Sequence, residues 1–369
     1  MPHGHNYTTR KTTTRLLFFI CILFAGFAFA GLLFSHQGIA ETPKLILSAI
    51  DVGQGDSILA EFPNGQVMLV DAGGRSEGAA VVKYLRQRKV SRIDILVASH
   101  PHEDHIGGML AVMDAFQIGK VWDSGYVHGS RTQENFLATI KDKGIRFGTP
   151  KSGFTQSVGD ARIDVLAPVR PLSGTDSDPN NNSVVLRVIY GQISFLLTGD
   201  MESEERNTVS PWPQTTVIKI AHHGSRNGTD RNFLKALSPR VAVISSGRGN
   251  NYGHPHSETL SALKSANVKT HNTADTGTVV VSTDGKTISV KTLGPTSHSS
   301  ASGGGYYGGN KEKSPPPSTG KDGYIGNVNS KIFHRPSCGS LPAEKNRIYF
   351  KSRNEAISQG YRPCKKCNP

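Results

Sequence analysis

Four potential metal ligands stand within six residues, directly after the apolar run Ile93–Ala98. They are His100, His102, Asp104 and His105. Histidine offers a neutral nitrogen and aspartate a hard oxygen, a combination that suits zinc or manganese. Alternation separates the first two histidines from the adjacent pair, so the sequence predicts one pair for each of two divalent metal ions. The alternative is a polar surface loop that is rich in histidine by chance.

A second set of four ligands lies near the C-terminus. Three residues separate His334 from Cys338, and two separate Cys364 from Cys367, which is spacing typical of a zinc site. Four protein ligands close such a site, so we expect a structural zinc ion. It would stabilise residues 322–369, a unit too short for a self-sufficient core. The alternative is a disulfide with a spare thiol.

Residues 44–294 have the composition of a globular α/β domain that could position the first cluster. Helices are predicted at Ala79–Arg88, Gln133–Lys143, Asp230–Ala236 and His256–Ser265. Strands are predicted at Leu45–Ile50, Val67–Val70, Ile93–Ala98, Val184–Ile189, Ile193–Leu197, Thr216–Ile220, Val241–Ser245 and Thr278–Ser282. This mixed order favours a sandwich of sheets with helices outside.

Residues 1–40 are predicted to be a signal peptide or a membrane anchor. Basic residues precede the apolar run Leu16–Phe34, which is long enough to span a bilayer. Ala28-Phe29-Ala30 resembles a signal-peptidase site, so cleavage stays open. We therefore expect a protein that is secreted or anchored on the outer face of the cell membrane. Residues 295–321 are rich in glycine, serine and proline and are predicted to be a linker.

The composition excludes several classes of protein. Hydrophobic residues make up 36% of the chain, too few for many membrane spans, and four cysteines cannot form a disulfide scaffold in 369 residues. The formal net charge is +13, and residues 321–369 hold ten basic and three acidic side chains. This region is predicted to bind a DNA backbone without sequence preference; anionic envelope polymers are the alternative. The expected DNA contacts are Arg335, Lys351, Arg353, Arg362, Lys365 and Lys366. No obligate protein partner is evident.

The HxHxDH pattern resembles the metallo-β-lactamase superfamily, and further motifs resemble the extracellular domain of the competence protein ComEC. These motifs are DVGQGDS (Asp51–Ser57), LVDAGG (Leu69–Gly74), LLTGD (Leu196–Asp200), KIAHHGS (Lys219–Ser225) and YGHPH (Tyr252–His256). The resemblance implies a four-layer αββα sandwich with metal ions at one edge. Only one apolar segment is present, so we expect a stand-alone version of that domain without the DNA channel.

The resemblance also implies roles for single residues. It places His100 and His102 on the first metal ion, Asp104 and His105 on the second, and Asp200 between them. One of His222 and His223 would be the last ligand, and Asp71 would support a ligating imidazole from behind.

One histidine of the family pattern is missing. Many superfamily members carry it shortly before the bridging aspartate, where this chain has residues 178–183 (DPNNNS). His128 lies too far upstream to fit the motif. This leaves open whether the first metal ion is weakly held or is bound by Asn, Asp or water.

The predicted activity is that of an exported metal-dependent hydrolase, a nuclease that cleaves DNA phosphodiesters through a metal-activated water. Asp104 and His254 are the catalytic candidates; His254 could donate a proton or a hydrogen bond, or could only shape the pocket. The alternatives are a hydrolase of an envelope phosphodiester, a lactone or, least in keeping with ComEC, a β-lactam. A further alternative is a surface protein that binds DNA without cleaving it.

The C-terminal unit resembles the metal-binding domain of the DNA-repair protein Ada. The motifs that carry the resemblance are KIFHRPSC (Lys331–Cys338) and GYRPCKKC (Gly360–Cys367). In that family the first ligand is a cysteine that accepts a methyl group from DNA phosphotriesters. His334 stands there in this chain, so we expect a small zinc-bound α+β module that has lost methyl transfer and keeps a phosphate-facing surface.

Overall fold

The computed structural model describes residues 43–295, 323–336, 338–350 and 361–364, together with residues 1, 356 and 367. Apart from Met1 and Pro295, the predicted leader and linker lie outside the described residues. So do four of the predicted DNA contacts, Lys351, Arg353, Lys365 and Lys366. Among the described residues, no helix combines the length and the apolar character that crossing a bilayer requires.

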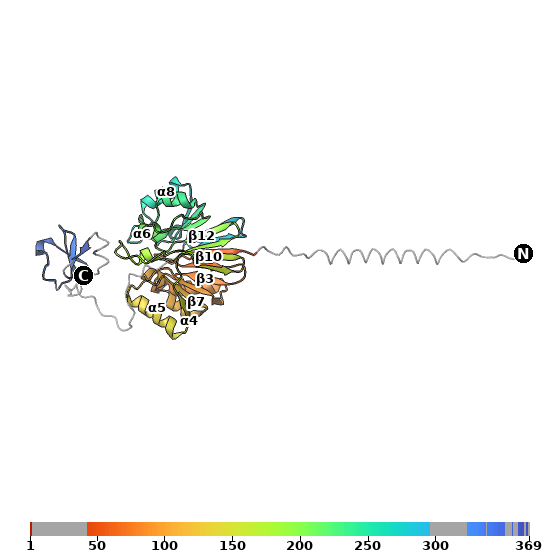
Figure 1. The fold of residues 1–369 in the computed structure, drawn as a ribbon, viewed down its shortest axis with the longest axis horizontal. Coiled ribbons are helices and arrows are strands. Elements are labelled where there is room, and N and C mark those ends of the chain that lie inside the picture. The colour runs from red at the N-terminus through yellow and green to blue at the C-terminus, as the bar shows by residue number, and fades with distance from the viewer. Residues whose placement is uncertain are drawn as a thin grey trace.

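Two mixed sheets form the centre of the large domain (Figure 1). The first has the order β17 (Ile288–Thr292), β16 (Val279–Thr283), β1 (Leu45–Ala49), β2 (Ile58–Glu61), β3 (Val67–Val70), β5 (Ile95–Ala98), β7 (Lys120–Asp123), β8 (Arg146–Gly148). The second has the order β15 (Lys269–Asn272), β14 (Val241–Ile244), β13 (Val217–Lys219), β12 (Ile193–Leu197), β11 (Val185–Tyr190), β10 (Ala161–Ala167), β9 (Thr155–Val158). A separate pair joins β4 (Arg92–Ile93) to β6 (Gln117–Ile118).

The central strands are buried on both faces, and alternation of their side chains defines the layers. In β12, Phe195 and Leu197 pack into the core between the two sheets, whereas Leu196 packs into the core on the outer side. In β5, Val97 faces the sheet-to-sheet core and Leu96 the opposite side. Strands with two apolar faces need a cover on each, which helices supply here.

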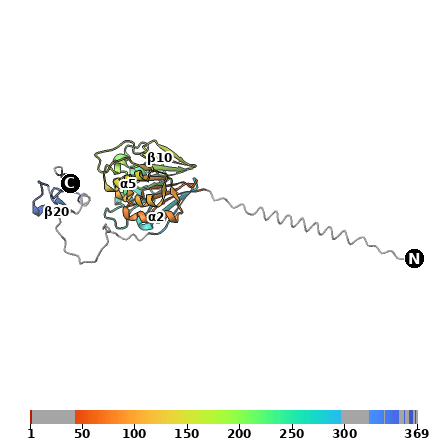
Figure 2. The same cartoon turned by 90° about the horizontal axis from the view of Figure 1, so that it is seen from below.

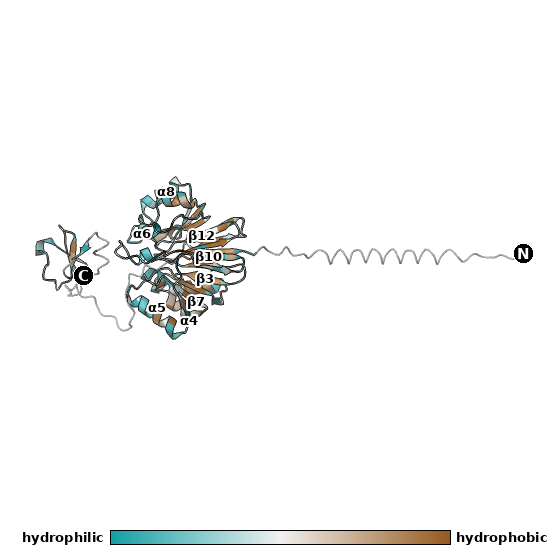
Figure 3. Ribbon diagram, in the orientation of Figure 1, coloured by the Kyte–Doolittle hydropathy of each residue, from teal (hydrophilic) through white to brown (hydrophobic). Residues whose placement is uncertain are grey.

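Helices cover the outer faces of both sheets (Figures 1 and 2). On the first sheet lie α2 (Gly78–Gln87), α4 (Met109–Ala115) and α5 (Arg131–Asp142); on the second lie α7 (Arg231–Leu237) and α8 (Ser257–Ser265). Hydrophobic residues, in brown, concentrate in the inner strands, whereas the covering helices also carry hydrophilic residues, in teal (Figure 3). The expected four-layer αββα sandwich is therefore confirmed.

Short helical turns complete the large domain and lie mainly in the loops that follow strands. They are η1 (Arg75–Glu77), α3 (Glu103–Ile106), η2 (Asn180–Asn182), α6 (Ser203–Arg206), η3 (Ala221–Gly224) and α9 (Thr273–Thr276).

The predicted elements agree with the structure to within two residues at their ends, with one exception. The run predicted as a single strand at Ile93–Ala98 is divided at Asp94, whose carboxylate accepts a hydrogen bond from Val67 N. Several strands were not predicted, among them β9 (TQSV) and β15 (KTHN). Both are polar edge strands, which lack the apolar run that marks a buried strand.

The C-terminal unit contains a four-stranded sheet of its own. The order is β20 (Arg347–Phe350), β18 (Tyr324–Asn327), β19 (Ile332–His334), β21 (Arg362–Pro363), and η4 (Glu344–Asn346) precedes β20. Its described core is small and holds Phe333, Phe350, Ala356 and Tyr361. A core of this size is consistent with a need for a metal ion as a second source of stability.

Candidate metal centre

Neighbouring parallel strands deliver the candidate ligands to one edge of the sandwich. In the first sheet β3 and β5 run parallel, and Asp71 and residues 100–105 follow their carboxyl ends. In the second sheet β12, β13 and β14 run parallel; Asp200 follows β12, and His222 and His223 follow β13. The carboxyl ends of parallel strands meet at one edge, where α/β proteins place their sites.

Asp104, His105 and His223 gather on one side of Asp200, and we call this group the His105 half-site. Asp200 Oδ2 lies 3.3 Å from His105 Nε2 and 3.2 Å from His223 Nε2. Asp104 Oδ2 lies 3.4 Å from His223 Nε2 and 4.0 Å from His105 Nε2. Ligands at about 2.1 Å from one ion are at most about 4.2 Å apart, so all of these pairs could share a cation.

Asp200 also approaches His100, which in turn lies close to His102, and we call these two histidines the His100 half-site. His100 Nε2 lies 3.8 Å from Asp200 Oδ2 and 3.0 Å from His102 Nδ1. Asp200 Oδ1 is buried and, within the described part of the chain, has no hydrogen-bond partner. A carboxylate with an unsatisfied buried oxygen between imidazole nitrogens is a donor set that fits divalent cations.

Hydrogen bonds behind the ligands fix the orientation of the rings. Asp71 Oδ2 lies 2.8 Å from His105 Nδ1, and Asp71 also accepts hydrogen bonds from Ser99 N and Ser99 Oγ at 2.8 and 2.6 Å. The carbonyl oxygen of Ser245 lies 3.0 Å from His223 Nδ1. Such partners keep the proton on Nδ1 and turn Nε2 toward the centre. The geometry therefore gives Asp71 the supporting position that the sequence predicted.

Burial lowers the pKa of two histidines in the cluster, whereas nearby carboxylates raise the pKa of a third. Burial holds the pKa of His100 well below its usual value and lowers the pKa of His102 to about 4, so both rings are neutral and able to ligate near pH 7. Burial also lowers the pKa of His105, but nearby carboxylates, with Asp200 foremost, outweigh it and raise the pKa well above its usual value. An excess of carboxylates that attracts protons attracts metal cations as well.

Asp56 and Lys219 form a buried ion pair beside the centre that the sequence did not reveal. Lys219 Nζ lies 2.6 Å from Asp56 Oδ2. The ligand atoms of Asp56, His105, Asp200 and His223 all lie within 4.8 Å of one another. Asp56 belongs to the DVGQGDS motif, which carries the family resemblance without assigning Asp56 a role. Its proximity to a ligand on another sheet could not be inferred from local spacing.

The loop of Asp56 also packs against the ligand loop through its backbone. Asp56 N donates a hydrogen bond to Asp104 O at 3.3 Å. Gly55 has a φ of +135°, and a Cβ there would lie 2.3 Å from Asp104 O. Only glycine tolerates that backbone and that proximity. The glycine-rich turn therefore fixes the position of the Asp104 backbone in the metal centre.

His254 lies beside the centre in a loop that ends at α8. Its ring centroid is 5.3 Å from that of His222 and 6.2 Å from that of His223. Burial, followed by the charges of His222 and His223, lowers the pKa of His254 to about 3. A role for His254 as a proton donor near pH 7 is disfavoured, because a neutral imidazole donates only a hydrogen bond. Tyr252 stacks on this ring at 5.6 Å and is 61% exposed.

The four predicted ligands of the C-terminal unit also come together. One ligand atom from each of His334, Cys338, Cys364 and Cys367 lies within 4.8 Å of the others, and His334 Nδ1 is 3.4 Å from Cys338 Sγ. A set of one nitrogen and three sulfurs fits tetrahedral zinc. Two of the predicted DNA contacts, Arg335 and Arg362, are exposed. In the sequence they lie next to His334 and close to Cys364.

Comparison with known proteins adds two family matches. Residues 50–248 match the metallo-beta-lactamase superfamily, and residues 317–369 match the metal binding domain of Ada.

Several curated proteins from bacteria are similar to the large domain. ComE operon protein 3 of Bacillus subtilis is 31% identical over 252 residues, which cover 62% of this chain and 32% of that protein. Recombination protein 2 of Haemophilus influenzae is 28% identical over 248 residues (65% of this chain, 29% of that protein). Competence protein ComA of Neisseria gonorrhoeae is 30% identical over 223 residues (59% and 29%). The chain thus spans about a third of the length of these relatives.

Proposed function

This chain belongs to the metallo-β-lactamase superfamily of metal-dependent hydrolases, and on that premise we propose that it is an exported nuclease that hydrolyses DNA phosphodiesters. The observation that carries the proposal is the convergence of two groups of imidazole and carboxylate ligands on one oxygen, Asp200 Oδ2. When bound there, two divalent cations activate water for attack and neutralise charge on a phosphoryl oxygen.

The residues of the chain supply position and electrostatics for this reaction. Asp104, His105 and His223 would hold one cation, His100 and His102 the other, and Asp200 would contact both. Asp71 keeps the His105 ring oriented through its hydrogen bond to Nδ1. His254, held neutral beside His222, would donate a hydrogen bond to an oxygen of the scissile phosphate.

Two observations favour DNA over other phosphodiesters and over lactones. The relatives that resemble the large domain bear names from competence and recombination, processes that handle DNA. The C-terminal residues 321–369 hold ten basic and three acidic side chains, a charge suited to a phosphate backbone. Tethering such a module to the hydrolase would raise the local concentration of DNA at the metal centre.

The test is cleavage of linear and circular DNA by the purified full-length chain loaded with Mn²⁺ or Zn²⁺. Asp104→Ala should abolish cleavage, whereas Asp114→Ala, at a carboxylate whose side chain is 70% exposed on α4, should leave it unchanged. Lack of cleavage by the wild type, or equal cleavage by Asp104→Ala, would refute the nuclease. Turnover of a chromogenic phosphodiester or a lactone without DNA cleavage would assign the site to the alternative substrates.

DNA binding is tested separately with the inactive Asp104→Ala protein. Fluorescence anisotropy with labelled duplexes of unrelated sequence should give similar affinities that fall steeply as salt rises. Affinity that does not depend on salt would contradict a basic module that binds the backbone.

A further inference from the structure

We propose that His222 is the third histidine ligand of the His100 half-site, and that Glu202 and Asn180 hold it in place. This assignment rests on the metal centre of the proposed function but not on DNA as its substrate. It would replace the family histidine that the chain lacks before Asp200.

The position of the His222 ring allows it to share a cation with Asp200. Its Nε2 lies 3.7 Å from Asp200 Oδ2, close to the 3.8 Å that separates His100 Nε2 from the same oxygen. Both values lie between the separation of about 3.4 Å expected for tetrahedral zinc ligands and the upper bound of about 4.2 Å for any two ligands of one ion. His222 therefore approaches the bridging oxygen as closely as a predicted ligand does.

The number of candidate ligands on each side favours the His100 half-site as the place of His222. The His105 half-site already has four candidate protein ligands, namely Asp104, His105, His223 and Asp200. Four ligands complete the usual tetrahedral coordination of zinc. The His100 half-site has only His100, His102 and the shared Asp200, and His222 would bring it to the same number.

Glu202 lies behind His222 as Asp71 lies behind His105. Glu202 Oε1 is 2.9 Å from His222 Nδ1, and the residue is buried at 3% exposure. The contact lies outside hydrogen-bond geometry, whereas Asp71 and His105 form a hydrogen bond. Glu202 therefore places a negative charge beside Nδ1 of His222, while Nε2 lies on the side of Asp200.

Asn180 connects this arrangement to the segment where the family histidine is missing. Its Nδ2 donates a hydrogen bond of 3.1 Å to Glu202 Oε1, and Asn180 is itself buried. The segment 178–183 therefore supports the centre indirectly, through the carboxylate that orients His222, rather than by direct ligation.

The backbone of η3 turns both adjacent histidines toward Asp200. His222 has φ 48° and ψ 51°, and His223 has φ 53° and ψ 21°. In an extended chain, neighbouring side chains point to opposite sides, whereas the left-handed backbone at these two residues brings both rings close to Asp200. This conformation costs about 1–2 kcal/mol per non-glycine residue and persists where surrounding contacts impose it.

His128 is the competing candidate for the same coordination position. Its ring lies 5.4 Å from that of His102, nearer to the centre than its place in the sequence suggested. It is exposed, however, whereas His222 is partly buried and has a buried carboxylate at Nδ1. A variant of each histidine separates the two assignments.

The experiment measures manganese binding by the full-length chain, because Mn²⁺ prefers the nitrogen and oxygen ligands of the centre to thiolates. Wild type should bind two Mn²⁺ by equilibrium dialysis and give the exchange-coupled electron paramagnetic resonance spectrum of a paired site. His222→Ala should bind one Mn²⁺ with an uncoupled spectrum, and His128→Ala should match wild type. Glu202→Gln should weaken the second binding event by about 10–100-fold, the usual effect of losing such a partner.

Several results would overturn the assignment. These are two tightly bound ions in His222→Ala, loss of both ions in that variant, or loss of one ion in His128→Ala instead. Circular dichroism establishes that each variant is folded, and Glu202→Gln serves as the second test if His222→Ala does not fold. Because binding is measured without DNA, correct stoichiometries with no DNA cleavage would refute the nuclease and leave the ligand assignment intact.

Discussion

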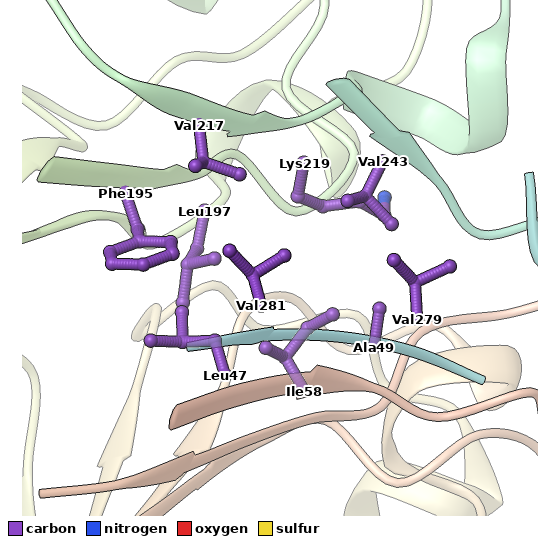
Figure 4. Close-up of a pocket in the computed structure, with 10 residues that line it drawn as sticks. All are labelled: Leu47, Ala49, Ile58, Phe195, Leu197, Val217, Lys219, Val243, Val279 and Val281. Carbon is purple, nitrogen blue, oxygen red and sulfur yellow. The ribbon is translucent and has the colours of Figure 1, made fainter. Parts of the chain in front are cut away.

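Replacing Lys219 by methionine should destabilise the large domain strongly, because it leaves the buried Asp56 carboxylate without its cation. Both side chains are 3% exposed, and Lys219 Nζ also donates to Ile220 O at 2.8 Å. Figure 4 shows the lysine among apolar side chains of both sheets, around a cavity of about 20 Å³. That volume holds one water molecule at most, which is too little to hydrate a lone carboxylate as bulk water would.

The magnitude follows from the separation of the charges. At 2.6 Å and an effective dielectric constant of about 20, the attraction is about 6 kcal/mol, part of which offsets the desolvation of the pair. Breaking a buried pair by removing one partner costs about 3–5 kcal/mol, and we expect this loss for Lys219→Met. Removing both charges in Lys219→Met/Asp56→Asn should recover most of it.

Guanidinium unfolding followed by tryptophan fluorescence measures this domain, since Trp122 and Trp212 both lie in it. Asp56 Oδ1 lies 3.5 Å from His223 Nδ1, so a bound cation would partly compensate the lone carboxylate. The loss should therefore be larger with a chelator than with saturating Mn²⁺. A single variant within 1 kcal/mol of wild type, or a double variant as unstable as the single one, would refute the reasoning.

Four further predictions follow from features already described. Gly55→Ala should lower the melting temperature and the affinity for Mn²⁺, because its Cβ would displace Asp104. Gly65 also has positive φ but open space around it, so Gly65→Ala should lose only the stability that corresponds to backbone strain. Equal losses of melting temperature in the two variants would contradict the clash. Burial raises the pKa of Asp123 to about 6, so the folded state holds this proton more tightly; the stability it contributes is present below about pH 4 and is lost as pH rises through 6. Unfolding measurements at pH 4 and 7 should therefore show wild type losing about 3 kcal/mol relative to Asp123→Asn, and a constant difference would exclude the titration. Cys364→Ser should reduce the zinc content by one ion and collapse the nuclear magnetic resonance spectrum of the C-terminal unit, whereas an unchanged zinc content would place the metal elsewhere. Tyr252→Ala should raise KM for single-stranded DNA while leaving turnover of a small chromogenic phosphodiester unchanged, because the exposed ring offers a surface on which a base can stack; equal effects on both substrates would argue for a role in the metal centre instead.

The candidate ligands could be selected from the sequence because metal chemistry concentrates such residues in short motifs at strand ends. His100, His102, Asp104 and His105 lie within six residues after an apolar strand, and the family resemblance added Asp200 after the mainly apolar strand β12. The four-layer architecture followed from the same strands, together with the family resemblance that these motifs carry.

The remaining features depend on contacts between segments far apart in the chain. Asp56 forms an ion pair with Lys219 from the other sheet, and the Asn180 side chain donates a hydrogen bond to Glu202. No rule based on sequence spacing could have paired these residues. The left-handed backbone at His222 and His223 could not be predicted from residue type either, because positive φ stays uncommon even for histidine, which adopts it more often than most residues. For that reason the sequence could not decide between these two histidines, whereas the structure turns both toward Asp200.

The burial of the strands that carry the ligands determines how slowly the centre can open. β5, β12 and β13 are buried along their whole length, so their amide protons exchange only when large parts of the domain unfold. We expect the amides of the residues directly after β5 and β12 to exchange slowly as well, whereas Tyr252 and its neighbours lie on an exposed loop. The ligands at the ends of the buried strands therefore move rarely, although the loop beside them is exposed to solvent. Displacing these ligands from their positions requires unfolding of the sandwich itself.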